Sequence, residues 1–205
     1  MPFRLSTPGA TVVRVSSTEP KPQRADARRN RERIVDAARE LFAELGQATQ
    51  MDDVARRANV GVGTVYRHFP TKSALIGELL ATKFRHHAEV ARRWAQEPDG
   101  WTAFEGFLRE SFAAMAQDVT LQQRVSWVSE GEALARAEEE RLILSGVVGE
   151  LIERAKAEGT MRETFTIDDV PALMCAAGAV IGAQGRTPVL ADRFIEFLID
   201  GLRAP

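Results

Sequence analysis

The sequence predicts an all-α protein of about nine helices, and three observations support that prediction. Apolar residues recur at helical spacing in one segment after another, and no alternating strand pattern competes with them. Turn signals separate these segments, among them EPDGW at 97–101 and QGRTP at 184–188. The 205 residues are 44% hydrophobic, which is enough for a substantial core.

Charge is divided unevenly along the chain. Residues 1–85 hold 15 lysines and arginines against 9 acidic residues, whereas residues 86–205 hold 12 against 20. A basic N-terminal part on an acidic body is typical of a protein that binds polyanions.

The composition also points to a cellular compartment. No apolar run is long enough for a transmembrane helix, and the N-terminus lacks the apolar stretch of a signal peptide. Cys175 is the single cysteine, which excludes an internal disulfide and fits a reducing cytoplasm. We therefore expect a cytoplasmic protein with no membrane contact, and we interpret Cys175 as a small core residue.

Residues 1–25 are rich in Pro, Ser, Thr and Gly, so we expect a disordered basic tail. Contact with phosphates and simple solubilisation remain equally open for its cationic residues. A helix should follow at 26–45 and end at Gly46. Its apolar stripe predicts the core of a small helical unit: Ile34, Ala37, Ala38, Leu41, Phe42 and Leu45.

Residues 49–72, TQMDDVARRANVGVGTVYRHFPTK, read as two short helices joined by a tight turn. Thr49 is the expected N-cap of the first helix, with Asp52 as an approximate capping box. Asn59 tolerates the left-handed conformation that ends a helix, and Gly61 and Gly63 are expected to let the backbone turn. Pro70 ends the second helix.

The second short helix has an inward and an outward side. Val65 and Phe69 are four residues apart and share the inward face. Thr64, Tyr66, Arg67 and His68 remain on or near the outward faces. A short helix whose hydrogen-bonding side chains face solvent is suited to insertion into a DNA major groove.

The stretch VGVGTVYRHFPTKSALI, residues 60–76, resembles the signature of the tetracycline-repressor (TetR) family of bacterial transcriptional regulators. IVDAARELFAELG, residues 34–46, is similar to the first helix of that family. The resemblance covers about 26–83. It implies a helix-turn-helix DNA-binding domain at 26–72 and a helical effector-binding and dimerisation domain at 73–205.

Nine residues are the expected contacts to double-stranded operator DNA. Thr49 offers a hydroxyl and helix N-terminal amides to phosphate, and Tyr66, His68 and Lys72 match family positions that contact the DNA backbone. Partial burial remains open for Tyr66, and capping or packing for His68. Base edges should meet the early part of the second helix and its arginine. The full set is Thr49, Gln50, Val62, Gly63, Thr64, Tyr66, Arg67, His68 and Lys72.

Two positions depart from the family pattern. The family often has a Ser where this chain has Gly61, and a Lys or Arg where it has Val62. These departures put two phosphate contacts in doubt, and the basic tail offers compensation.

The segment from 73 onward is expected to supply six helices, near 73–96, 102–118, 121–130, 132–157, 168–182 and 189–202. The first of these belongs to both domains and should couple them mechanically. The resemblance implies a pocket for a small apolar or amphipathic effector, with aromatic residues as its lining. An ordinary core is equally open for each candidate: Trp94, Trp101, Phe104, Phe107, Phe112, Met115, Trp127 and Met174.

The last two helices should pair two copies of the chain. The helix at 167–182 is apolar on most faces and rich in small residues, among them Ala177 and Gly178. Small residues let helices approach closely, and such a helix must be covered on nearly all sides. We predict a homodimer through 167–182 and 189–202, with closure of the chain's own core as the alternative.

These features favour a dimeric repressor released from a near-palindromic operator by a small molecule. Activation of transcription remains open. A helical enzyme is the first rival, but the sequence shows no nucleophile elbow, phosphate loop, catalytic grouping or metal-ligand spacing, and no cofactor is expected. The adjacent histidines His86 and His87 point about 100° apart on a helix, which is poor geometry for chelation. A protein-interaction module without DNA binding is the second rival.

Overall fold

The computed structural model describes residues 22–117, 132–182 and 188–205. Within these ranges eight α-helices and two short 3-10 turns are present, with no strand ladder, and the predicted all-α class is confirmed. The predicted helix near 121–130 lies outside the described residues. The helices are α1 (Pro22–Leu45), α2 (Met51–Arg57), α3 (Val62–His68), α4 (Lys72–Trp94), α5 (Gly100–Gln117), α7 (Glu132–Ala157), α8 (Val170–Gly182) and α9 (Pro188–Leu202).

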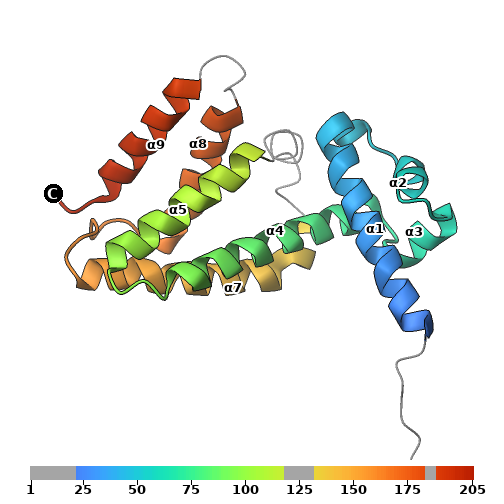
Figure 1. Ribbon diagram of the computed structural model, residues 1–205, viewed down its shortest axis with the longest axis horizontal. Coiled ribbons are helices and arrows are strands. Elements are labelled where there is room, and N and C mark those ends of the chain that lie inside the picture. The colour runs from blue at the N-terminus through green and yellow to red at the C-terminus, as the bar shows by residue number, and fades with distance from the viewer. Residues whose placement is uncertain (1–21, 118–131, 183–187) are drawn as a thin grey trace, which may run out of the picture.

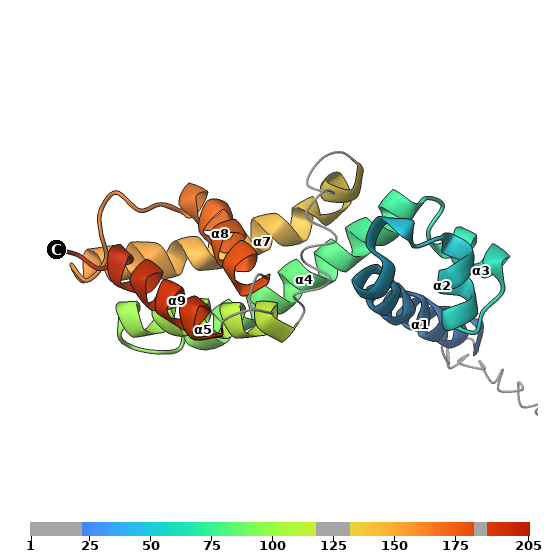
Figure 2. The same ribbon diagram turned by 90° about the horizontal axis from the view of Figure 1, so that it is seen from above.

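The helices form two groups joined by α4. Helices α1, α2 and α3 gather at one end of α4, and α5 and α7 lie along its other part, with α8 and α9 beyond α5 (Figure 1). Helix α7 runs beside α4 in both views (Figure 2). Helix α4 contributes buried residues to both groups, Leu75 and Ile76 to the first and Val90 to the second, as expected of a shared helix.

The N-terminal group encloses a small apolar core. The predicted stripe of α1 is buried except for Leu45, which is 43% exposed. The two inward residues of α3, Val65 and Phe69, are fully buried. Helix α4 closes this core with Leu75, Ile76 and Leu79. A helix of two turns such as α3 is unstable alone, so these contacts hold it in place.

Helix α1 begins earlier than the sequence suggested. It starts at Pro22, so residues 22–25 are helical and do not belong to the tail expected at 1–25. Proline fits the first position of a helix because its missing N–H would have no partner there. Residues 1–21 lie outside the described ranges.

The C-terminal group has a larger core, to which α4, α5, α7, α8 and α9 all contribute buried apolar residues. Arg154 near the end of α7 and Glu158 just beyond it form hydrogen bonds to the turn between α4 and α5. Arg154 donates hydrogen bonds to the carbonyl oxygens of Ala95 at 3.0 Å and Glu97 at 2.9 Å, and Glu158 accepts one from the N–H of Gly100 at 2.7 Å. These contacts satisfy backbone groups that helix ends leave unpaired.

Gly106 of α5 lies directly against the ring of Trp94 at the end of α4. A Cβ at this position would lie 2.6 Å from Cδ2 of Trp94, whose ring is held by a 2.9 Å hydrogen bond from Nε1 to Glu110. We expect Gly106→Ala to destabilise the fold by about 1–3 kcal/mol through overpacking, although alanine favours helix. Urea unfolding of both proteins measures the difference.

The matched control for that substitution is Gly146→Ala on α7. A Cβ at Gly146 meets no atom within 4 Å, so alanine should stabilise the helix by up to about 1 kcal/mol. Equal effects of the two substitutions would contradict a close contact at Gly106.

Helix α9 is held to α5 by charged side chains. Arg109 donates two hydrogen bonds to the Glu196 carboxylate, at 2.7 and 2.9 Å, and the geometry is bidentate. Arg203, just beyond α9, lies 4.4 Å from the ring centroid of Trp101. The outward face of α9 still carries Phe197, which is 65% exposed.

The structure corrects the expected orientation of α8. Ala177 and Gly178, which we placed at a dimer seam, are buried inside the chain. Cys175 is exposed and free, so it is not the core residue that we expected. The exposed small residues of α8 share one face at helical spacing: Ala172, Cys175, Ala176 and Ala179. Among the described helices none is long and apolar enough to span a membrane.

Candidate DNA-binding site

Asn59 makes the turn between α2 and α3. It has a φ of 52°, the left-handed conformation expected for it. The N–H of Val60 then donates to the carbonyl of Ala55 at 3.0 Å. Gly61, in contrast, has an extended backbone with φ −67°, and Gly63 lies inside α3, so the left-handed residue of this turn is Asn59 and neither glycine has a positive φ.

Thr49 does not cap α2 as predicted. Gln50 is the N-cap, and its N–H donates to the carboxylate of Asp53 at 3.3 Å. Thr49 is 1% exposed, and its hydroxyl donates to the carbonyl of Leu41 at 3.0 Å. The backbone N–H of Thr49 donates to the carbonyl oxygen of Gly46 at 3.2 Å. Because both groups bond inside the protein, the structure offers no free donor of Thr49 to a phosphate.

Several α3 side chains that we expected to contact DNA are exposed to solvent. Val62 is 40% exposed and Tyr66 is 46% exposed, so Tyr66 is not a buried support. Thr64 and His68 are half-buried at the edges of this face. A Cβ on Gly63 would meet nothing within 4 Å, so a nucleic-acid backbone or base can approach closely there.

Arg67 is exposed and oriented by its own helix. Its Nε donates to the carbonyl of Gly63 at 3.0 Å. The two terminal nitrogens have no partner within the described residues and remain able to donate. Two such donors match the O6 and N7 acceptors of guanine.

Lys72 lies at the start of α4, where Thr71 is the N-cap and accepts from the N–H of Ala74. The Lys72 ammonium donates to the carbonyl of Gln47 at 2.6 Å and lies 5.6 Å from the Phe42 ring centroid. Partial burial lowers the pKa of Lys72. The ammonium has further N–H donors for a phosphate. Gln50, the N-cap of α2, is exposed.

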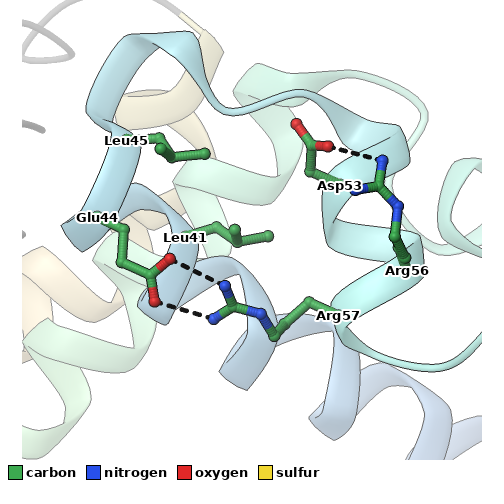
Figure 3. Close-up of a pocket in the computed structure, with 6 residues that line it drawn as sticks. All are labelled: Leu41, Glu44, Leu45, Asp53, Arg56 and Arg57. Carbon is green, nitrogen blue, oxygen red and sulfur yellow. Dashed lines mark hydrogen bonds and ion pairs between the residues drawn. The ribbon is translucent and has the colours of Figure 1, made fainter.

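A hollow of about 500 Å³ lies between α1 and α2 and is lined by Leu41, Glu44, Leu45, Asp53, Arg56 and Arg57 (Figure 3). Arg57 forms a bidentate pair with Glu44, with both distances 2.9–3.0 Å. This pairing raises the pKa of Arg57 and lowers that of Glu44. Arg56 pairs with Asp53 at 3.0 Å, so the hollow is charge-balanced and does not attract an anion strongly.

The predicted effector residues come together as a core. Five of them are at most 4% exposed and pack against one another: Trp101, Phe104, Phe107, Phe112 and Met115. Met174 is half-buried against this core, and Trp127 lies outside the described residues. Trp94 lines a second hollow of about 370 Å³ with Arg93, Gln96, Glu97 and Glu110. Apart from Trp94, the aromatic candidates that the structure describes are packed in the core.

Sequence reasoning missed two buried polar residues of this second group. His87 of α4 is 6% exposed, Ser111 of α5 is 0% exposed, and Ser111 Oγ lies 3.3 Å from His87 Nδ1. No sequence pattern indicates this pair, because the partners are 24 residues apart. Within the described residues no group of three or more His, Cys, Asp or Glu could hold a metal ion.

The fold and the exposed face of α3 define a helix-turn-helix protein. The model of the family described as "Bacterial regulatory proteins, tetR family" matches residues 34–79. The model "Transcriptional regulator SbtR-like, C-terminal domain" matches residues 99–204, more than half of the chain. The chain therefore belongs to the TetR family of bacterial transcriptional regulators.

Solved structures and curated relatives agree with this assignment. The TetR transcription regulatory protein from Mycobacterium vanbaalenii is 31% identical, with 89% of this chain and 100% of that chain covered and a TM-score of 0.61. FadR from Bacillus subtilis, solved with stearoyl-CoA, is 18% identical over 83% of this chain and 98% of its own, with a TM-score of 0.66, and shows the fold alone.

Among curated relatives, the HTH-type transcriptional repressor KstR of Rhodococcus jostii is 49% identical over 55 residues. That match covers 26% of this chain and 26% of the relative, so the chain spans about a quarter of the curated relatives it matches.

Replacement of Arg67 by Ala should relax base preference. Loss of a two-donor contact to guanine is expected to cost about 1–3 kcal/mol on the preferred DNA site and little on random DNA. Selection of bound sequences from random DNA, done with both proteins, checks this result. An unchanged consensus would show that Arg67 does not read a base.

Lys72→Ala is the comparison for Arg67→Ala. Removal of a phosphate contact should weaken binding to all sequences alike and lower the salt slope by about one unit. A change of consensus in Lys72→Ala would contradict its role at the phosphate backbone.

Proposed function

We propose that this protein is a cytoplasmic transcriptional repressor that binds a near-palindromic operator as a homodimer and is released by a small molecule. The observation that carries the proposal is α3: Val65 and Phe69 fix it in the core, while Val62, Tyr66 and Arg67 face water. This arrangement suits insertion of α3 into a major groove. We place the DNA-binding domain at 26–72 and the effector and dimerisation domain at 73–205, with no catalytic role for either.

The proposed dimer uses the outward faces of α8 and α9. The small exposed residues of α8 allow close helix approach, and exposed Phe197 of α9 offers apolar area for burial. The two helices lie next to each other at the end of the molecule opposite α1 to α3 (Figure 1). Two such protomers form a four-helix bundle and present two α3 helices, expected about 34–36 Å apart or a multiple of it.

The proposed effector is an apolar or amphipathic small molecule bound between α4, α5, α7 and α8. The aromatic core supplies the apolar contact, and α4 extends from there to the N-terminal group. Two fold neighbours support this choice: FadR was solved in complex with stearoyl-CoA, and KstR2 of Mycobacterium tuberculosis is described as a ketosteroid transcriptional regulator. Because the aromatic side chains pack closely here, the ligand must separate them, and this movement shifts α4.

Selection of bound sequences from random DNA, followed by a ligand screen on the selected operator, tests the proposal. We expect a near-palindromic consensus and at least one apolar ligand that lowers operator affinity. Coupling is reciprocal, so the operator must lower the affinity for that ligand by the same factor. No enrichment of any sequence over random DNA would contradict DNA recognition, and equal ligand affinity with and without operator would contradict the effector role.

A further inference from the structure

Arg31 of α1 contacts both the end of the proposed recognition helix and the shared helix α4. Its guanidinium carbon lies 4.7 Å from the ring centroid of Phe69, the residue that follows α3. Its Nη2 donates to Glu78 Oε2 of α4 at 2.5 Å. One side chain therefore joins α1, α3 and α4.

These contacts are partly shielded from water. Phe69 is 0% exposed, and the side chains of Arg31 and Glu78 are 36% and 17% exposed. The neighbouring pair of Arg28 and Glu32, within α1, has side chains 76% and 62% exposed. Because water screens the Arg31 contacts less, its stacking and ion pairing are stronger than those of a surface pair.

We propose that Arg31 is a positioning residue that fixes the orientation of α3 relative to α4 and so sets base selectivity. Glu78 holds the guanidinium in place over Phe69, and Phe69 ends the helix that carries Tyr66 and Arg67. A shift of α4 moves Glu78, draws Arg31 from Phe69 and frees α3 to change its angle. This inference rests on the proposed function, because it assigns α3 to the operator.

The sign of the effect of Glu78→Gln separates positioning from simple electrostatics. Removal of a negative charge should by itself raise affinity for DNA. If Glu78 positions Arg31, the binding-competent fraction of the protein falls instead, and the apparent Kd rises as that fraction decreases. We expect about a five- to tenfold loss on the selected operator and no loss on random DNA.

The matched control is Glu32→Gln, which removes the same charge from an exposed position on α1. Its operator affinity should stay the same or rise. Arg31→Lys gives a second variant that keeps the charge but loses the planar group that stacks and donates in a fork. It should reproduce the loss of selectivity, measured as the ratio of operator to random-DNA affinity.

A structural role alone is tested with Leu79→Ala, which removes a buried side chain from the same core and leaves both Arg31 and Glu78 in place. It should lower the unfolding temperature more than Glu78→Gln while its selectivity ratio stays close to the original. Binding is measured well below every unfolding temperature. Hydrogen exchange at the amide of Phe69, which donates to Val65 at 2.8 Å, should rise in Glu78→Gln and not in Glu32→Gln.

An unchanged or increased selectivity ratio in both Glu78→Gln and Arg31→Lys would overturn the inference, and so would an equal loss in Leu79→Ala. Absence of sequence-selective binding by the unmutated protein would instead overturn the proposed function. The two failures are therefore distinguishable in one set of measurements.

Discussion

Replacement of Ala176 by Arg is expected to give monomers and to weaken operator binding by about a hundredfold or more. Ala176 lies in the exposed stripe of small residues on α8, where a long charged side chain prevents close helix approach and leaves a charge without a partner. Loss of the dimer separates the two α3 helices, and linked binding of two sites contributes about 10²–10⁴ in affinity. Helical content should not change, because Ala176 faces away from the chain's own core.

Sedimentation measures the assembly directly, with a species of about 22.6 kDa expected for Ala176→Arg and one of twice that mass for the unmutated protein. Ala157→Arg adds the same charge at an exposed position on α7 and should remain dimeric. Cys175 provides a second readout, since the exposed thiol should react slowly with a maleimide in the dimer and rapidly in Ala176→Arg. A monomeric unmutated protein at micromolar concentration would contradict the proposed seam.

The short helices of the N-terminal group could be predicted because local signals agreed. Val65 and Phe69 have the spacing of one helix face, and Asn59 tolerates the left-handed turn that the structure shows. The cap of α2 could not be fixed, because Thr49 and Gln50 are adjacent polar residues. A 3-10 turn at Gly46–Ala48 directs the Thr49 hydroxyl to Leu41 and moves the cap by one residue.

Hydrophobic periodicity could not predict which residues of α8 are buried. Its sequence VPALMCAAGAVIG has no polar face, so the sequence does not reveal which small residues point inward. The structure buries Ala177 and Gly178 and exposes Cys175 and Ala176. The aromatic residues of α5 pose a related problem, because the same side chains suit a packed core and a ligand cavity. Only tertiary contacts between distant segments distinguish these cases.

The buried pair of His87 and Ser111 should make the protein sensitive to acid. Burial, with smaller effects from Lys83 and His86, lowers the pKa of His87 from 6.5 to about 4. Between these values the unfolded chain binds a proton at His87 and the folded chain does not. The contribution of His87 to the free energy of unfolding is therefore fully present above about pH 6.5 and falls as the pH decreases towards 4. The free energy of unfolding decreases by at most about 1.4 kcal/mol per pH unit, so about 2 kcal/mol of it is lost at pH 5.

Urea unfolding at pH 7.5 and pH 5.0 measures this effect as a difference between variants, which removes the contribution of carboxylates common to all. His87→Gln should be less stable at pH 7.5, because it disturbs the packing against Ser111, but should lose about 2 kcal/mol less than the unmutated protein on acidification. His86→Gln alters the exposed neighbour and should keep the acid sensitivity. If the unmutated protein and His87→Gln lose the same free energy of unfolding between the two pH values, His87 is not the group that couples folding to protons. The expected result would show that the contact of α4 with α5 requires a neutral imidazole, because a charged one cannot remain beside Ser111 without solvation.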